Sequence, residues 1–89
     1  MPKDPKKLLQ EMRRSKAKWK RRDIVALYEG FGFVVEHGTK HDKIFHPDYP
    51  WLVEGLPRHR KLPKVYVSKA VKLVDRLLEL EHTSQKYGH

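Results

Sequence analysis

The apolar positions of the chain recur with two spacings, one typical of helices and one typical of strands. Apolar residues three and four positions apart share one face of an α-helix, whereas alternate residues share one face of a β-strand. The helical spacing occurs in residues 5–14, in residues 23–30 and again from Pro63 to about Leu80. A proline at the start of the first and last of these segments suits the first turn of a helix. The pattern therefore predicts three helices.

Three short segments between the second and third helix predict β-strands. In residues 31–36 the odd-numbered positions are all apolar, as in a strand with one buried face. Residues 41–46 and 51–56 follow as two further strands, because turn-forming residues at 37–40 and 47–50 separate them. Only the helices are available to cover such a sheet. We therefore expect an α+β fold of two layers, with a three-stranded antiparallel sheet and helices on one face.

These elements and the charge distribution divide the chain into three regions. We expect a basic N-terminal extension with a short helix in residues 1–20, the main domain in residues 21–81 and a polar, frayed C-terminal tail in residues 82–89. A chain of 89 residues has the length of one domain. Its active site, if it has one, should therefore be a shallow surface patch rather than a cleft between two lobes.

The net charge is +9, and it is concentrated toward the start of the chain. Residues 1–22 carry ten basic and two acidic side chains, whereas residues 23–89 carry ten and nine. Residues 23–89, in which the charges nearly balance, contain a second basic run without an acidic residue: Arg58, Arg60, Lys61, Lys64, Lys69 and Lys72. Basic patches bind polyanions, so nucleic acid is the expected partner, and a merely solubilising surface is the alternative.

The chain contains no cysteine, which excludes disulfides, thiolate nucleophiles and zinc–thiolate sites. No apolar run reaches the ~18 residues of a membrane span, and no signal-peptide segment follows Met1. We therefore expect a cytoplasmic protein that does not associate with a membrane.

Five short motifs follow one another from the end of the second expected helix to the start of the last. They are Gly30–Phe33, Gly38–His41, Ile44–Asp48, Leu56–His59 and Leu62–Pro63. None is specific alone, but their order and spacing are. By these motifs the segment from Gly30 to about Leu80, more than half of the chain, resembles the HicA-type (YcfA-like) mRNA interferase toxins.

The resemblance implies a fold, an activity and a partner. The fold would be like that of the double-stranded-RNA-binding domain, with the order helix, three strands, helix. The activity would be that of a type II toxin, an endoribonuclease that cuts mRNA with no metal ion or cofactor, and the partner would be a HicB-type antitoxin protein. The family's catalytic histidine falls on His41, which stands three residues after Gly38 where many members have two.

RNA can be cut without a metal ion, because its own 2′-hydroxyl can attack the adjacent phosphate. The protein then moves two protons and stabilises negative charge, which imidazoles and nearby cations can do at neutral pH. His41 is the first candidate catalytic residue, because lysines flank it, and His59 is the second, because it stands between two arginines. The candidate RNA-binding residues are Lys40, Lys43, Arg58, Arg60, Lys61 and Lys64.

Several alternatives stay open. A non-catalytic RNA-binding module of the same fold, or a protein-interaction domain, would also have a basic surface. His59 could bind phosphate or only support its loop. We interpret His46 as structural and His37 as a solvated turn residue. A metal site built on His37, His41 and His46 is disfavoured, because positions 41 and 46 of a strand lie on opposite faces.

Exposed aromatic residues could stack on RNA bases. In a small domain, however, most aromatic side chains are expected in the core. We assign Trp19 and Trp51 to the core and expect Tyr49, which lies in a turn next to proline, to be the most exposed.

Overall fold

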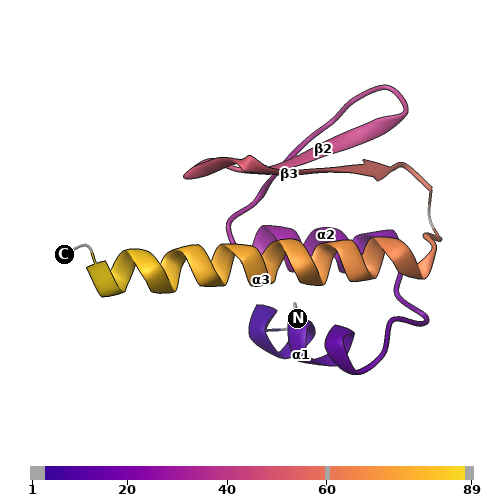
Figure 1. The fold of residues 1–89 in the computed structure, drawn as a ribbon. Coiled ribbons are helices and arrows are strands. Elements are labelled where there is room, and N and C mark those ends of the chain that lie inside the picture. Colours follow the sequence, from indigo (N-terminus) through magenta and orange to yellow (C-terminus); the bar gives the residue numbers. More distant parts are fainter. Residues whose placement is uncertain (1–3, 60, 88–89) are drawn as a thin grey trace.

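The computed structural model describes residues 4–59 and 61–87, with side chains as far as Thr83. This part of the chain forms three helices and three strands in the expected order (Figure 1). They are α1 (Pro5–Arg14), α2 (Arg21–Gly30), β1 (Val34–Glu36), β2 (His41–His46), β3 (Tyr49–Pro57) and α3 (Lys64–Tyr87). The predicted α+β class is confirmed.

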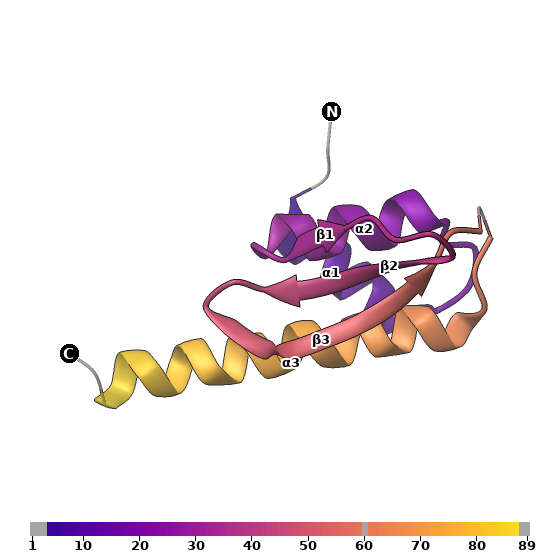
Figure 2. The same ribbon diagram turned by 90° about the horizontal axis from the view of Figure 1, so that it is seen from above.

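The strands form an open antiparallel sheet in the order β1-β2-β3, which confirms the expected three-stranded sheet. Figure 2 shows them side by side, with β3 above α3. A bulge between Phe45 and His46 shifts the register of the β2–β3 hairpin, so that His46 pairs with Tyr49. β3 therefore begins at Tyr49 and ends at Pro57, and it is longer at both ends than the predicted strand over residues 51–56.

The helices form two layers on one side of the sheet, so the molecule has three layers rather than the expected two. α2 and α3 pack on the sheet, and α1 lies on the side of these helices away from it (Figure 1). Leu8, Leu9 and Met12 of α1 are buried in the common core. Arg13 of α1 also forms an ion pair with Asp75 of α3. The helix of the N-terminal extension is therefore part of the folded core.

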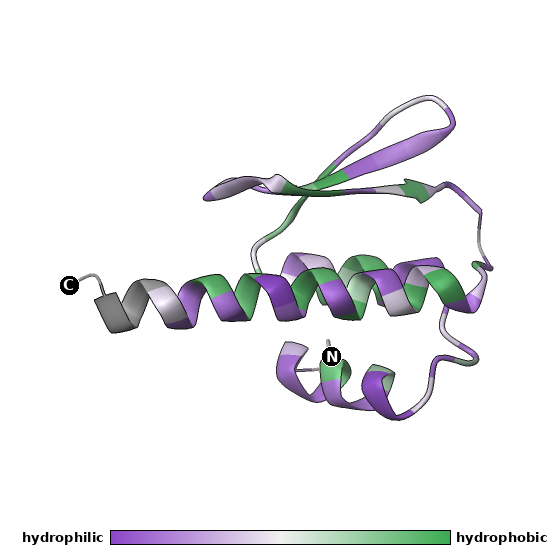
Figure 3. Cartoon of the chain, in the orientation of Figure 1, coloured by the Kyte–Doolittle hydropathy of each residue, from purple (hydrophilic) through white to green (hydrophobic). Residues whose placement is uncertain are grey.

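The core lies between the sheet and the helices and continues beneath α1. Polar and apolar positions alternate along α3 and β3 (Figure 3), as expected of elements with one buried and one solvated face. The helical spacing of apolar residues in α3 is confirmed by the burial of Val67, Ala70, Val71, Val74 and Leu77.

β1 begins three residues later than predicted, because residues 31–33 close the end of α2 instead. The backbone N–H groups of Phe31 and Phe33 donate to the carbonyl oxygen of Tyr28, and that of Gly32 donates to the carbonyl oxygen of Glu29. Satisfying the last carbonyls of a helix in this way leaves these N–H groups unavailable to the sheet.

Two helix boundaries also differ from the prediction. α2 begins at Arg21 rather than Asp23, and the Asp23 carboxylate accepts a hydrogen bond from the backbone nitrogen of Lys20 at 2.9 Å. α3 continues past Leu80 to Tyr87, through most of the segment expected to be a frayed tail. The apolar stripe ends earlier, but α3 contains no glycine or proline that would stop the helix.

Candidate functional site

One end of the molecule brings together the start of β2, the end of β3 and the starts of α2 and α3 (Figure 1). His41 of β2 lies opposite Pro57 of β3, whose carbonyl oxygen accepts a hydrogen bond from Arg21 Nε at 3.2 Å. Lys20 forms an isolated β-bridge with Lys61. We call this region the basic end, after its basic residues Lys18, Lys20, Arg21, Arg22, Lys40, Arg58, Lys61 and Lys64.

A buried carboxylate, that of Asp42, organises the basic end. Its side chain is fully buried and forms an ion pair with the Arg21 guanidinium. The backbone N–H of Gly38 donates to Asp42 Oδ1 at 3.2 Å. His37 Nδ1 lies 3.4 Å and Arg58 Nε 3.7 Å from the same oxygen. A buried carboxylate is costly unless it is paired and hydrogen-bonded, so these contacts hold three chain segments together.

The turn before His41 is held on two sides. The N–H of Gly38 binds the Asp42 carboxylate, and its carbonyl oxygen accepts a hydrogen bond from Arg58 Nη1 at 2.9 Å. A Cβ atom at position 38 would lie 2.2 Å from the carbonyl oxygen of His41, a distance that no side chain can adopt. Only glycine therefore allows the chain to turn this tightly into β2.

The side chain of His41 is exposed on the face of the sheet turned away from the helices, which we call the outer face. Alternation along β2 places His41 and Lys43 on this face and buries Asp42 against the helices. A shallow hollow of about 340 Å³ lies beside His41 and is lined by His41, Asp42, Lys43, Val53, Glu54 and Gly55.

His59 lies at the same end of the sheet as four of the six predicted RNA-binding residues. His59 is exposed two residues after Pro57, the residue paired with His41. Lys43 shares the outer face with His41, and Arg60 lies outside the described residues. The remaining candidates all belong to the basic end and are exposed: Lys40, Arg58, Lys61 and Lys64.

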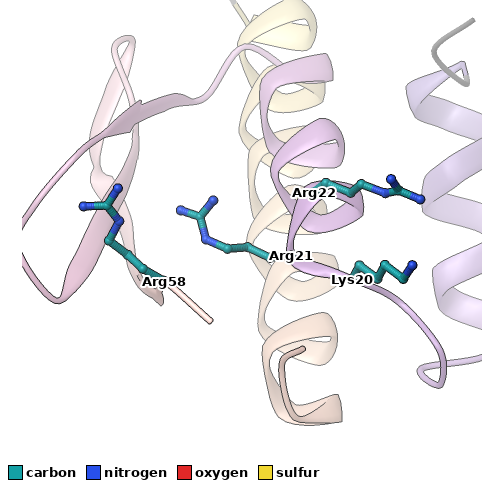
Figure 4. A pocket seen from close by; sticks show the side chains of 4 residues that line it. All are labelled: Lys20, Arg21, Arg22 and Arg58. Carbon is teal, nitrogen blue, oxygen red and sulfur yellow. The ribbon is translucent and has the colours of Figure 1, made fainter. Parts of the chain in front are cut away.

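A second hollow, of about 520 Å³, lies at the start of α2 and is lined by four basic residues (Figure 4). Arg21 and Arg58 point toward one another across it, as their shared contact with Asp42 requires. Lys20 and Arg22 project the other way, toward α1. The cations at this edge thus face two directions, and Asp42 neutralises part of the charge of the first pair.

His46 has the surroundings of a structural residue. Its side chain is buried, its ring packs edge-on against Phe33 with 5.1 Å between ring centres, and its Nδ1 accepts a hydrogen bond from the backbone nitrogen of Asp48 at 3.1 Å. Within the described ranges, no three histidine, aspartate or glutamate side chains are grouped so that they could hold a metal ion.

The prediction for the aromatic residues was wrong for Trp51. Trp51 is 63% exposed, because its position in β3 falls out of phase with the buried Leu52 and Leu56. Tyr49, expected to be the most exposed, packs partly against the core. Trp19 also packs partly against it, and its Nε1 donates to the carbonyl oxygen of Ser15 at 2.8 Å.

Sequence reasoning missed two residues of this site, Asp42 and Arg21. The signal for Asp42 was available, since it alternates in phase with Ile44 and His46 and so had to lie on the buried face of β2. A carboxylate at such a position needs a cation, but the pattern along the chain does not say which.

Comparison with models of protein families, with curated proteins and with solved structures finds no match to this chain. Of the helices in the described part of the chain, none has the length and apolar character needed to cross a membrane.

Proposed function

We propose that the protein is a metal-independent endoribonuclease, the toxin of a type II toxin–antitoxin pair, and that His41 acts in catalysis. The observation that carries this proposal is the position of His41. It is an exposed imidazole at the start of β2, next to a turn that is hydrogen-bonded to Asp42, at the end where the basic side chains gather. The order and spacing of the motifs that resemble the HicA-type toxins also support this proposal.

The reaction that we propose uses the RNA's own 2′-hydroxyl as nucleophile. The 2′-oxygen forms a bond to phosphorus and the bond from phosphorus to the 5′-oxygen breaks, which leaves a 2′,3′-cyclic phosphate and a 5′-hydroxyl. His41 takes the proton of the 2′-hydroxyl, and His59 supplies a proton to the leaving oxygen. Lys43 and Lys40 stabilise the charge that develops on the phosphate.

The order α2-β1-β2-β3-α3 is also that of the double-stranded-RNA-binding domain, and we propose that this domain is of that type. The antitoxin partner would be a HicB-type protein that covers His41. Covering an exposed catalytic side chain is enough to block access of RNA, because the site is a surface and not a cleft.

The test is RNA cleavage by the purified protein in the presence of EDTA. We expect His41→Ala to lower the cleavage rate roughly 100- to 10,000-fold, as for loss of a general acid or base. His82→Ala is the matched control, since His82 is an exposed histidine in α3. Both variants should keep the circular-dichroism spectrum and melting temperature of the parent protein. Full cleavage by His41→Ala would refute the assignment.

Two other outcomes would select the alternative functions. RNA binding that weakens steeply with salt, without cleavage by the parent protein at any concentration, would leave a non-catalytic RNA-binding module. Failure to retain RNA even at low salt would favour a protein-interaction domain.

A further inference from the structure

The outer face of the sheet carries an apolar patch beside His41. Val34 of β1, Phe45 of β2 and Val53 of β3 lie in one row across the three strands. Trp51 lies two residues before Val53, in the part of β3 that the bulge leaves without partners in β2. No described element packs over this face, and Trp51, Val53 and Val34 are 63%, 45% and 40% exposed. We call these four residues the apolar row.

The apolar row is unusual for a solvated sheet face, where polar side chains normally alternate with the buried ones. Val65 of α3 is the one further large hydrophobic side chain with substantial exposure among the described residues. Tyr49 packs edge-on against Trp51, with 5.6 Å between ring centres. This contact supports the indole ring from one side and leaves the rest of its surface accessible.

Cations surround the row on the side of His41. Lys43 stands on the same face, with its Nζ 5.3 Å from the centre of the Phe45 ring. Beyond it lie the turn with Lys40 and the basic end. Glu36, an acid on this face, pairs in register with Lys43 across β1 and β2, and Glu54, which lines the hollow beside His41, forms an ion pair with Lys69. The patch is thus apolar and aromatic at one end and basic at the other.

Gly55 keeps a hollow open between these two ends. It lines the hollow beside His41 together with Lys43 and Val53. A Cβ atom at position 55 would have no atom within 4 Å, so packing does not require glycine there. Glycine in a strand interior weakens the strand, and it often marks a place where a ligand approaches the backbone.

We propose that the outer face binds the unpaired bases of a single-stranded RNA, with one base in the hollow over Gly55 and others stacked along the apolar row. This proposal rests on the proposed function and adds the strandedness and the path of its substrate. His41 and Phe45 lie on one face four residues apart along β2, about 13 Å. An RNA strand that is bound along β2 therefore brings its phosphates to His41 while its bases contact Phe45 and Trp51.

The chemistry of the face favours this occupant over duplex RNA. Aromatic side chains bind nucleic acids through the flat faces of bases, which a duplex hides inside its stack. The lysines beside the row suit the phosphates of the same strand. A hydrophobic protein partner would explain the exposed valines, but it would not require the cations at one end of the row.

Binding is measured first, by tryptophan fluorescence in the His41→Ala background, so that RNA is not consumed. We expect a single-stranded oligouridylate to quench Trp51 and a hairpin duplex of equal length to bind at least tenfold more weakly. Trp51→Ala should lower the affinity for the single strand roughly tenfold, as for loss of one stacked base. The affinity of this variant is measured by the fluorescence anisotropy of end-labelled RNA, because the substitution removes the tryptophan that reports binding. The control is Val65→Ala, which truncates another exposed apolar side chain (51%), in α3, and should leave the affinity unchanged.

Filling the hollow is a second and independent test. Gly55→Val adds a β-branched side chain that suits a strand and meets no neighbour, so the melting temperature should hold or rise. Affinity for the single strand and the cleavage rate should both fall at least tenfold. Unchanged binding by Gly55→Val and Trp51→Ala would overturn the proposal even if both proteins cut RNA normally.

The remaining outcomes separate this proposal from the proposed function. Quenching of Trp51 without any cleavage by the parent protein would support the binding face and refute the nuclease. Equal binding of hairpin and single strand would overturn the binding face. Self-association that Trp51→Ala abolishes, seen by sedimentation and without quenching by RNA, would also overturn it and assign the face to a second copy of the chain.

Discussion

Replacing Asp42 by asparagine tests the idea that one buried carboxylate holds the basic end together. The change keeps the size of the side chain but removes the charge that faces Arg21 and Arg58. Breaking a buried ion pair from one side costs ~3–5 kcal/mol, because the remaining charge is left without a partner. The Arg21 side chain is 23% exposed and can regain some hydration, so we expect about 2–3 kcal/mol.

A loss of this size should be easy to measure. For a domain of this length, 1 kcal/mol shifts the melting temperature by ~4–8 °C, so Asp42→Asn should lower it by roughly 10–20 °C. Urea denaturation followed by circular dichroism gives the free energy of unfolding directly. Asp75→Asn is the matched control. Its ion pair with Arg13 is largely exposed, and such pairs contribute ~0–1 kcal/mol.

A double-mutant cycle then shows whether Arg21 is the partner that matters. Arg21→Met should lower the free energy of unfolding of the parent protein, and in the Asp42→Asn background this loss should be smaller by at least about 1 kcal/mol. If Asp42→Asn costs no more than Asp75→Asn, or if the cost of Arg21→Met is the same in both backgrounds, the reasoning about the buried carboxylate is wrong.

Three further predictions concern other parts of the molecule. Burial, and to a lesser extent the carboxylate of Glu54, raises the pKa of Tyr28 far above its usual value. The folded state then holds this proton more tightly, so stability should be full below about pH 10 and fall above it. Tyr28→Phe should reduce that fall in urea midpoints measured from pH 8 to 11, and an identical fall would contradict the assignment. Gly38→Ala should lower both the melting temperature and RNA cleavage, since its Cβ would meet the carbonyl oxygen of His41; normal values for both would refute the tight turn. Met12→Ala should cost ~2–5 kcal/mol in urea denaturation, because the side chain is fully buried, and a cost near zero would mean that α1 is not part of the core.

The order and class of the elements could be predicted because hydrophobic spacing reports which face of a segment is buried. The ends of elements were harder, since they depend on backbone hydrogen bonds. Residues 31–33 alternate like a strand, yet their N–H groups bind the last carbonyls of α2. The predicted end of α3 was the last residue of its apolar stripe. The helix continues to Tyr87, because no glycine or proline stops it.

The candidate site could be predicted only in part, because sequence shows residue types but not their neighbours in space. His41 was chosen from its place in the motifs and from its flanking lysines, and His59 was chosen from its flanking arginines. In the structure His41 pairs with Pro57, and His59 follows Pro57 by two residues. The pairing of Asp42 with Arg21 joins segments 21 residues apart and leaves no local signal. Trp51 was assigned to the core from its residue type, against the alternation that places it outside.

The position of α1 has a consequence for how the protein folds during synthesis. Its ion pair joins residues 62 positions apart, Arg13 and Asp75, and its apolar side chains pack on α3. Ribosomes add ~5–20 residues per second, so α1 leaves the ribosome roughly 3–12 s before its partner on α3 does. During that interval α1 can pack only on α2, so Leu8, Leu9 and Met12 of this basic helix lack the part of their contacts that α3 supplies. The segment of the chain that is made early is therefore among the last to reach its final place.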